Sequence, residues 1–325
     1  MSAIYSIPAT STAVDAPLKQ VWIQGTKGLA NGYTSLTQAV IGGKTILFAF
    51  AQGTQSLDTY TLTGTAPWVE KTTVKTVLAG GKWDQLSSFM LGNITYLLAY
   101  RADTGAMGFY QVGDDITISP PYLFAASHTT PSAGFTTIAP FMCLGAQYIL
   151  GYDVTTGRVE NFSVTAKIKS DSTEPPLLAV NIWYHLWAKG WQHFAFFQLG
   201  GSTFFFKINL QKDKAGKASA DANIDHMHDL PALGAVEVGT KLLAKMKDMD
   251  GAKVTAAAIV PLSFGEPRLL TYIASSGTAA VYRIHADCMG WTLQSSSETF
   301  TGASIVIPYR IGDTSYALFY KGAAS

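Results

Sequence analysis

The chain has 325 residues, of which 48% are hydrophobic, 12% aromatic and only 14% charged, and its formal net charge is +1. Nucleic-acid binding needs a clustered cationic surface that displaces counterions, so this balance excludes nucleic acid as an expected partner. No run reaches the 18 or more apolar residues of a membrane-crossing helix, and we expect no membrane association.

The first 15 residues, MSAIYSIPATSTAVD, lack both a charged n-region and an apolar h-region, so they are not expected to act as a signal peptide. Two cysteines, Cys143 and Cys288, are expected to be reduced and structural. Together these features predict a cytoplasmic protein. Export by a non-classical route would leave no trace in the sequence and stays open.

The stretch from Trp83 to Val112 shows the local pattern best. Runs rich in β-branched and aromatic residues predict strands over 86–91, 95–101 and 108–112, with a weaker fourth strand over 122–126. The segments LGN and ADTG between them suit tight hairpin turns, because glycine and asparagine tolerate the positive φ that such turns need.

This pattern returns six times along the chain. Each apolar run ends at what we term an anchor residue, and successive anchors are 48 to 64 residues apart: Phe50, Tyr100, Tyr152, Ile208, Tyr272 and Tyr320. A glycine precedes each anchor by seven or eight residues: Gly42, Gly92, Gly145, Gly200, Gly265 and Gly312. A period of this length indicates one closed array of supersecondary units rather than two unrelated domains.

A second aromatic residue follows four of the anchors by ten positions: Tyr60, Tyr110, Phe162 and Tyr282. Counting ten positions from Tyr320 runs past the C-terminus and, continued from Met1, arrives at Tyr5. We therefore predict an all-β fold, a six-bladed β-propeller of four antiparallel strands per blade that forms a single domain over residues 1–325. The sixth blade is expected to close the ring by pairing 304–311 and 316–321 with 3–7 and 20–24, because an open ring would expose sheet edges.

Two blades depart from the repeat. The fourth has Ile208 in place of an aromatic anchor, followed by a charged loop over 211–217, and the fifth is preceded by an extra stretch over 232–253. Long loops on a rigid scaffold often carry function, and this stretch is expected to be a loop that covers one mouth of the channel.

The strings FQLGGSTFFF (197–206) and FMLGNITYLLAYRADTG (89–105) resemble bacterial lectins of the Photorhabdus type and, more broadly, the fungal fucose-binding lectins. The resemblance implies six blades and sugar sites between blades that repeat a Trp, Arg or Glu. No Arg or Glu keeps a fixed offset here, since Arg101 has Asp153, Asn209 and Lys321 as counterparts. Because avidity comes from repeated sites, we expect the function at one asymmetric place. Fungal propellers similar to these also include cofactor-free hetero-Diels–Alderases.

Aromatic residues recur near the start of the predicted inner strands and in WYHLWAKGWQH (183–193). We predict that they form the substrate-binding wall of one pocket at the channel: Tyr33, Trp83, Phe135, Trp187 and Trp191. The equivalent residues of the fifth and sixth blades are expected to be Ala256 and Ala303. Packing between blades is the alternative for these aromatic side chains.

His193 is predicted to donate a hydrogen bond to a carbonyl in the transition state, with Gln85 or His185 as second choices. The preferred hypothesis is an enzyme without a cofactor that cyclises, or joins by cycloaddition, a small hydrophobic natural product. The alternative is a sugar-binding lectin that takes a monosaccharide between blades. We predict no metal site, because His226 and His228 lack a third ligand nearby and are expected on a solvated loop. The oligomeric state stays open.

Overall fold

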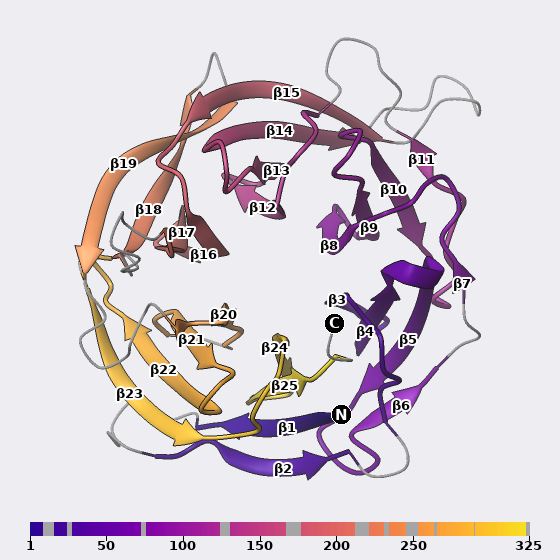
Figure 1. Cartoon of the computed structure of the whole chain (residues 1–325), viewed down its shortest axis with the longest axis vertical. Coiled ribbons are helices and arrows are strands. Elements are labelled where there is room, and N and C mark those ends of the chain that lie inside the picture. The colour runs from indigo at the N-terminus through magenta and orange to yellow at the C-terminus, as the bar shows by residue number, and fades with distance from the viewer. Residues whose placement is uncertain are drawn as a thin grey trace.

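The computed structural model describes residues 1–8, 16–24, 28–72, 76–123, 131–166, 177–211, 221–230, 234–244, 253–262, 265–288 and 290–322. Six antiparallel sheets stand around a common axis, with both termini in the same blade (Figure 1). The predicted six-bladed β-propeller is therefore confirmed. No helix in the described part of the chain is long and apolar enough to cross a bilayer.

The strands of the first three blades follow one another along the chain. Blade 1 consists of β3 (Ser35–Ile41), β4 (Lys44–Ala51), β5 (Ser56–Leu62) and β6 (Val69–Lys71), with β7 (Thr76–Val77) also on β5 and a 3-10 turn, η1, at Gln52–Thr54. Blade 2 consists of β8 (Gln85–Leu91), β9 (Ile94–Tyr100), β10 (Met107–Val112) and β11 (Tyr122–Leu123). Blade 3 consists of β12 (Thr137–Cys143), β13 (Ala146–Tyr152), β14 (Arg158–Ala166) and β15 (Leu177–Leu186).

The remaining blades include the one that joins the two ends. Blade 4 consists of β16 (Trp191–Leu199), β17 (Ser202–Asn209), β18 (Asp221–Leu230) and β19 (Gly234–Ala244). Blade 5 consists of β20 (Ala256–Val260), β21 (Arg268–Ile273), β22 (Thr278–Ile284) and β23 (Trp291–Glu298). Blade 6 consists of β24 (Ile305–Ile311) and β25 (Thr314–Tyr320) from the C-terminal end, then β1 (Ser2–Ile7) and β2 (Lys19–Ile23) from the N-terminal end.

The closure of the ring follows the predicted register. In blade 6, Tyr5 lies opposite Ala317, which is three residues before the anchor Tyr320. Tyr110 lies opposite Leu97, three residues before the anchor Tyr100, and the other second aromatics are placed in the same way. The ten-residue offset thus marks one structural position in both the continuous blades and the split blade.

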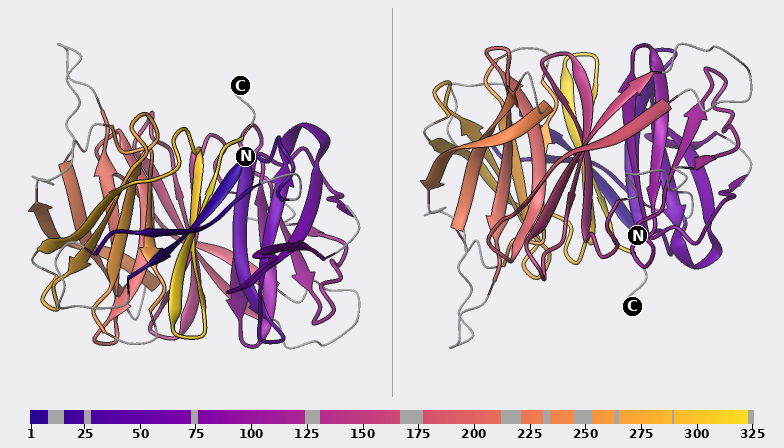
Figure 2. Two further views of the ribbon diagram at one scale, coloured as in Figure 1. Left: turned by 90° about the horizontal axis from the view of Figure 1, so that it is seen from below. Right: turned by 90° about the horizontal axis from the view of Figure 1, so that it is seen from above.

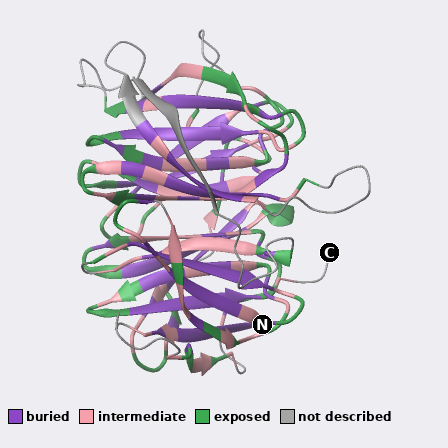
Figure 3. Ribbon diagram, turned by 90° about the vertical axis from the view of Figure 1, so that its left-hand side faces the viewer, coloured by how far each residue is buried: buried purple, intermediate pink, exposed green. Residues whose placement is uncertain are grey.

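The strands nearest the axis, which we call the inner strands, are β3, β8, β12, β16, β20 and β24 (Figure 1). The strands cross the thickness of the ring (Figure 2). Residues are buried along the middle of the strands and exposed at the turns (Figure 3). Apolar side chains from facing sheets pack into separate clusters between blades rather than into one central core. We call the ring face where the inner strands begin the latch face, and the face that carries the glycine turns the turn face.

Three local expectations were wrong. The stretch over 232–253 is not wholly a loop, because Gly234–Ala244 forms the outer strand of blade 4. His226 and His228 lie on strand β18 rather than on a solvated loop. Val254, not Ala256, is the fifth-blade equivalent of Tyr33, since Thr255, like Thr34, donates its backbone N–H to the anchor carbonyl. The predicted loop at 211–217 lies, after residue 211, outside the described residues.

Candidate functional site

Four tyrosine anchors act as latches between neighbouring blades. At the junction of blades 2 and 3, the backbone N–H of Phe135 donates to the Tyr100 hydroxyl at 3.1 Å, and that hydroxyl donates to the Ser132 carbonyl at 2.7 Å. The same pair of bonds, to residues separated by three positions, is made by Tyr152, Tyr272 and Tyr320. Burial raises the pKa of Tyr100 to about 12, so the latch hydroxyl keeps its proton at neutral pH.

In four of the blades, a hydroxyl residue at the base of the inner strand supports the backbone on both sides of the anchor. In blade 3, Thr136 donates to the carbonyl of the anchor Tyr152 and accepts the backbone N–H of Val154. The residues with the same pair of bonds in other blades are Thr34, Thr255 and Ser304. These bonds satisfy backbone groups at the edge of the ring and so define the ordinary junction.

The junction of blades 1 and 2 departs from this arrangement at every step. Its anchor, Phe50, has no hydroxyl, and the side chain of Gln55 replaces the latch by accepting the N–H of Trp83 at 2.7 Å and donating to its carbonyl at 3.1 Å. Gln55 has φ +54° at the end of the 3-10 turn, which aims its amide at the next blade. The supporting hydroxyl is replaced by a carboxylate, Asp84.

One carboxylate oxygen of Asp84 accepts a backbone N–H, as the hydroxyl of Thr136 does, and the other oxygen lies near the surface. Its Oδ2 accepts the N–H of Ala102 at 2.7 Å, and its Oδ1 accepts Nε2 of Gln52 at 2.7 Å. A cleft of about 510 Å³ opens there on the latch face. Its lining comes from both blades: Gln52, Gly53, Gln55, Lys82, Trp83, Asp84, Arg101 and Asp103.

The cleft is polar and balanced in charge, with two cations and two carboxylates. Nε and Nη2 of Arg101 donate to both oxygens of Asp103 at 2.6 and 2.8 Å. These hydrogen bonds lower the pKa of Asp103 and raise that of Arg101. Trp83 forms the floor but is fully buried, and its Nε1 donates to the Tyr110 hydroxyl at 2.7 Å. The cleft therefore presents carboxylates, amides and cations rather than an exposed aromatic face.

The structure does not bring the predicted aromatic wall together. Tyr33, Trp83, Phe135 and Trp191 are each buried at a different blade junction and belong to four separate apolar clusters. Tyr33 packs against Tyr60 and Tyr320, for example, while Phe135 packs against Tyr100. Trp187 joins only Trp191, in the same cluster. Their geometry is that of packing between blades.

The three predicted catalytic residues lie apart. Gln85, on the inner strand of blade 2, donates to the Phe135 carbonyl and accepts the Ile138 N–H, so its amide ties blade 2 to blade 3. His185 is exposed on the outer strand of blade 3 and packs on Trp183. His193 lies on the inner strand of blade 4, on the far side of blade 3 from Gln85.

His193 has an unusual conformation. It lies in a bulge of β16, with φ +56°, while β3, β8, β12, β20 and β24 pair with their second strands in unbroken register. Its imidazole hydrogen-bonds to the backbone of Val254 in blade 5. Because the anchor here is Ile208, which has no hydroxyl, this bond joins two blades that lack a tyrosine latch. Burial lowers the pKa of His193, and the bond to Val254 only partly offsets this.

Blade 4 also contains a buried ion pair. Nζ of Lys207 lies 2.5 Å from Oδ2 of Asp225, and both side chains are almost fully buried. The ammonium lies 4.0 Å from the ring centroid of Trp187 and 4.6 Å from that of Trp191. These two predicted substrate-binding tryptophans therefore enclose a cation of the protein itself.

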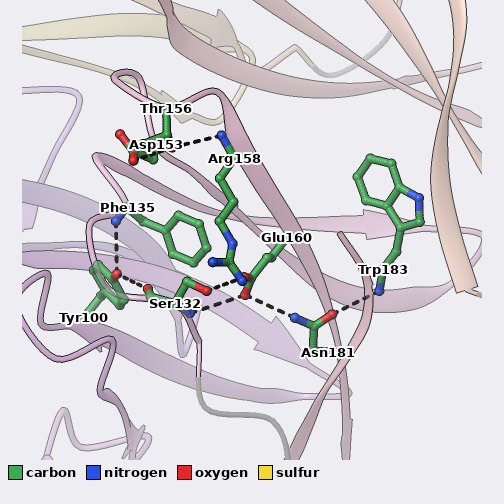
Figure 4. A network of polar contacts seen from close by, with 9 residues as sticks. All are labelled: Tyr100, Ser132, Phe135, Asp153, Thr156, Arg158, Glu160, Asn181 and Trp183. Atoms are coloured by element: carbon green, nitrogen blue, oxygen red, sulfur yellow. Dashed lines mark hydrogen bonds and ion pairs between the residues drawn. The ribbon is translucent and has the colours of Figure 1, made fainter. Parts of the chain in front are cut away.

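A second buried carboxylate supports the latch between blades 2 and 3 (Figure 4). Glu160 accepts the N–H and the hydroxyl of Ser132, at 3.3 and 2.5 Å, and Nδ2 of Asn181 at 3.1 Å. Nη2 of Arg158 lies 2.6 Å from its Oε1. Glu160 is only 1% exposed, so this buried network holds the connection into blade 3.

Another cleft, of about 580 Å³, lies on the turn face of blade 1. Threonines dominate its lining, together with Lys44, Glu70, Lys71 and Ile311 of blade 6. Lys71 is already paired with the buried Asp58 at 2.9 Å. This cleft does not coincide with a break in the latch pattern, whereas the cleft between blades 1 and 2 does.

Sequence reasoning noted that Arg101 has no counterpart in the other blades but did not predict the cleft around it. The sequence feature that marks this cleft is that two exceptions to the repeat pattern occur at the same blade junction. Phe50 stands where most anchors are tyrosines, and Asp84 stands where Thr34, Thr136 and their equivalents carry a hydroxyl. Recognising it required the position of Asp84 in the hydrogen-bond pattern, which the sequence does not display.

No family model matches this chain, and no curated protein matches it. Among solved structures, it is similar to an α-L-arabinanase of Penicillium chrysogenum complexed with arabinobiose, with 10% identity, a TM-score of 0.57 and coverage of 98% of both chains. It is also similar to a Bacteroides fragilis protein provisionally described as a 6-phosphogluconolactonase, with 13% identity, a TM-score of 0.54 and coverage of 94% of this chain and 84% of that one. A mutant of AofleA from Arthrobotrys oligospora gives 10% identity, a TM-score of 0.50 and coverage of 89% and 80%. At these identities the likeness shows the propeller fold alone.

Proposed function

We propose that this protein binds a carbohydrate in the cleft between blades 1 and 2, with one such site per chain. The observation that carries the proposal is Asp84, a carboxylate that replaces the supporting hydroxyl of blades 1, 3, 5 and 6 and borders a polar cleft of about 510 Å³. Sugar hydroxyls donate to carboxylates and accept from amide, guanidinium and ammonium groups. The cleft offers all of these groups.

The size and position of the cleft support a small ligand. Its volume falls within the range of about 300–1,000 Å³ that is usual for ligand pockets. Each wall comes from a different blade, as the lectin alternative expected, but the set of side chains occurs at one junction. The similar arabinanase structure, which holds arabinobiose, makes a sugar a reasonable ligand to test first.

The site favours binding over hydrolysis. Glycoside hydrolysis needs a carboxylic acid whose pKa is raised, so that it donates a proton to the leaving oxygen. The pKa of Asp103 is instead lowered by its hydrogen bonds from Arg101, and Asp84 already accepts two donors. We therefore propose a binding protein rather than a glycosidase.

Cyclisation or cycloaddition of a small hydrophobic molecule stays a prediction. It needs an aromatic wall with a hydrogen-bond donor beside it, whereas His193 and Gln85 bond to neighbouring blades and the aromatic residues pack at separate junctions. The geometry favours the carbohydrate site.

The test is titration calorimetry with a panel of pentoses and hexoses, followed by the Asp84→Thr variant. The threonine hydroxyl can accept a backbone N–H, as Thr34, Thr136 and Thr255 do in blades 1, 3 and 5, so this variant should fold normally while losing the carboxylate. Loss of a hydrogen bond to a charged group should weaken sugar binding about 10-fold to 100-fold. Thr136→Ser, at the same position in blade 3, is the matched control and should bind like the wild type. Several equivalent sites per chain, or unchanged binding by Asp84→Thr, would contradict the proposal.

A further inference from the structure

Among the residues that the structure describes, Lys82 is the one cation of the cleft between blades 1 and 2 that has no ion-pair partner. Arg101 is held by Asp103 through two hydrogen bonds, and both oxygens of Asp84 accept donors from Gln52 and Ala102. Lys82 lines the same cleft and is exposed. Within the described residues its ammonium makes no ion pair, although Asp84 is only two residues away.

Chain geometry keeps Lys82 available to a ligand. The residue between it and Asp84, Trp83, is fixed by Gln55 on its backbone and by Tyr110 on its indole. The backbone from which the exposed side chain of Lys82 projects is therefore held at the rim of the cleft. A fixed backbone lowers the entropy that a ligand contact must overcome.

We infer that the ligand is an acidic sugar, and that Lys82 binds its carboxylate. This inference rests on the proposed carbohydrate site and specifies the ligand further. The neutral ring hydroxyls would contact Asp84 and Gln52, where a ligand carboxylate would be repelled. A negative charge on the sugar is accommodated beside the ammonium of Lys82, which makes no ion pair with any described residue. A uronic acid has this combination of hydroxyls and a single carboxylate.

The experiment compares matched pairs of neutral and acidic sugars, such as galactose with galacturonate and glucose with glucuronate, by calorimetry at pH 7. An exposed ion pair should make the uronate bind about threefold to fivefold more tightly than its neutral partner at low salt. The preference should shrink in 0.5 M salt, where the screening length is only a few ångströms. In Lys82→Met the preference should vanish, because the uronate should lose more affinity than its neutral partner does.

Lys44→Met provides the control, because Lys44 is an exposed lysine that lines the cleft on the turn face. If Lys44→Met rather than Lys82→Met abolishes the preference, the anion binds on the turn face and the inference is wrong. If neutral and acidic sugars bind equally to the wild type, the inference is again wrong, but the carbohydrate site stands. If neither class binds, the proposed function fails and the inference fails with it.

Discussion

The buried ion pair of blade 4 makes the sharpest test of how this ring is packed. Asp225 lies opposite Phe205, three residues before the anchor Ile208, and so occupies the position of the second aromatic in the other blades. Lys207, directly before that anchor, takes the place of small residues such as Ala49 and Ala99. In blade 4 an ammonium and a carboxylate thus fill the space that an aromatic ring fills elsewhere.

Replacing Lys207 by Ala should destabilise the protein strongly. Asp225 is 0% exposed and its Oδ2 lies 2.5 Å from the ammonium, so the substitution leaves a carboxylate buried without its partner. Breaking a buried pair in this way costs about 3–5 kcal/mol. The double variant Lys207→Ala/Asp225→Tyr recreates the pattern of the other blades. Because a well-packed apolar replacement of a buried pair is often neutral, it should recover most of that loss, to within about 1–2 kcal/mol of the wild type.

Urea unfolding measures these changes, with tryptophan fluorescence as the signal because Trp187 and Trp191 contact the ammonium. Lys189→Ala, an exposed lysine at the same junction, serves as the control and should leave the unfolding free energy unchanged. The reasoning is refuted if Lys207→Ala costs less than about 1 kcal/mol, or if the double variant is no more stable than the single one.

Three further predictions concern the latches and the closure. Tyr100→Phe leaves the buried N–H of Phe135 without its acceptor and should lower the unfolding free energy by about 1–3 kcal/mol. The control Tyr184→Phe changes a residue that is 72% exposed and should have no effect. Equal effects of the two substitutions would contradict the latch. Burial holds the pKa of His193 in the folded state below its value in the unfolded state. The neutral imidazole therefore contributes to the free energy of unfolding above about pH 6.5, and this contribution is lost as the pH falls. Stability measured between pH 7 and 5 should therefore decline less in His193→Gln than in the wild type, and parallel curves would argue against this. Deleting 1–8 removes β1 and exposes the edge of β25, so the truncated protein should aggregate, and an unchanged melting temperature would disprove the closure.

Much of the fold could be predicted because strand pairing converts sequence spacing directly into position. The glycine before each anchor marks a turn, and the aromatic residue ten positions after most anchors marks a paired position in a hairpin; both depend on local register. For the same reason, the step from Tyr320 to Tyr5 predicted that the two ends of the chain share a sheet, which the pairing of Tyr5 with Ala317 confirms. Exceptions arose where local signals were weak, as in the outer strand of blade 4.

The site required the tertiary structure. Trp83 and Trp191 recur at regular positions, but whether such a ring faces a cavity or a neighbouring sheet depends on how two blades approach each other, and here both are buried between blades. Gln52 and Arg101 lie 49 positions apart in the sequence and line one cleft only because blades 1 and 2 are adjacent. The sequence determined the repeated hairpins, since hydrogen-bond register is local. The contacts between blades decided where a carboxylate, a guanidinium and an ammonium meet, because burial and proximity are properties of the assembled ring.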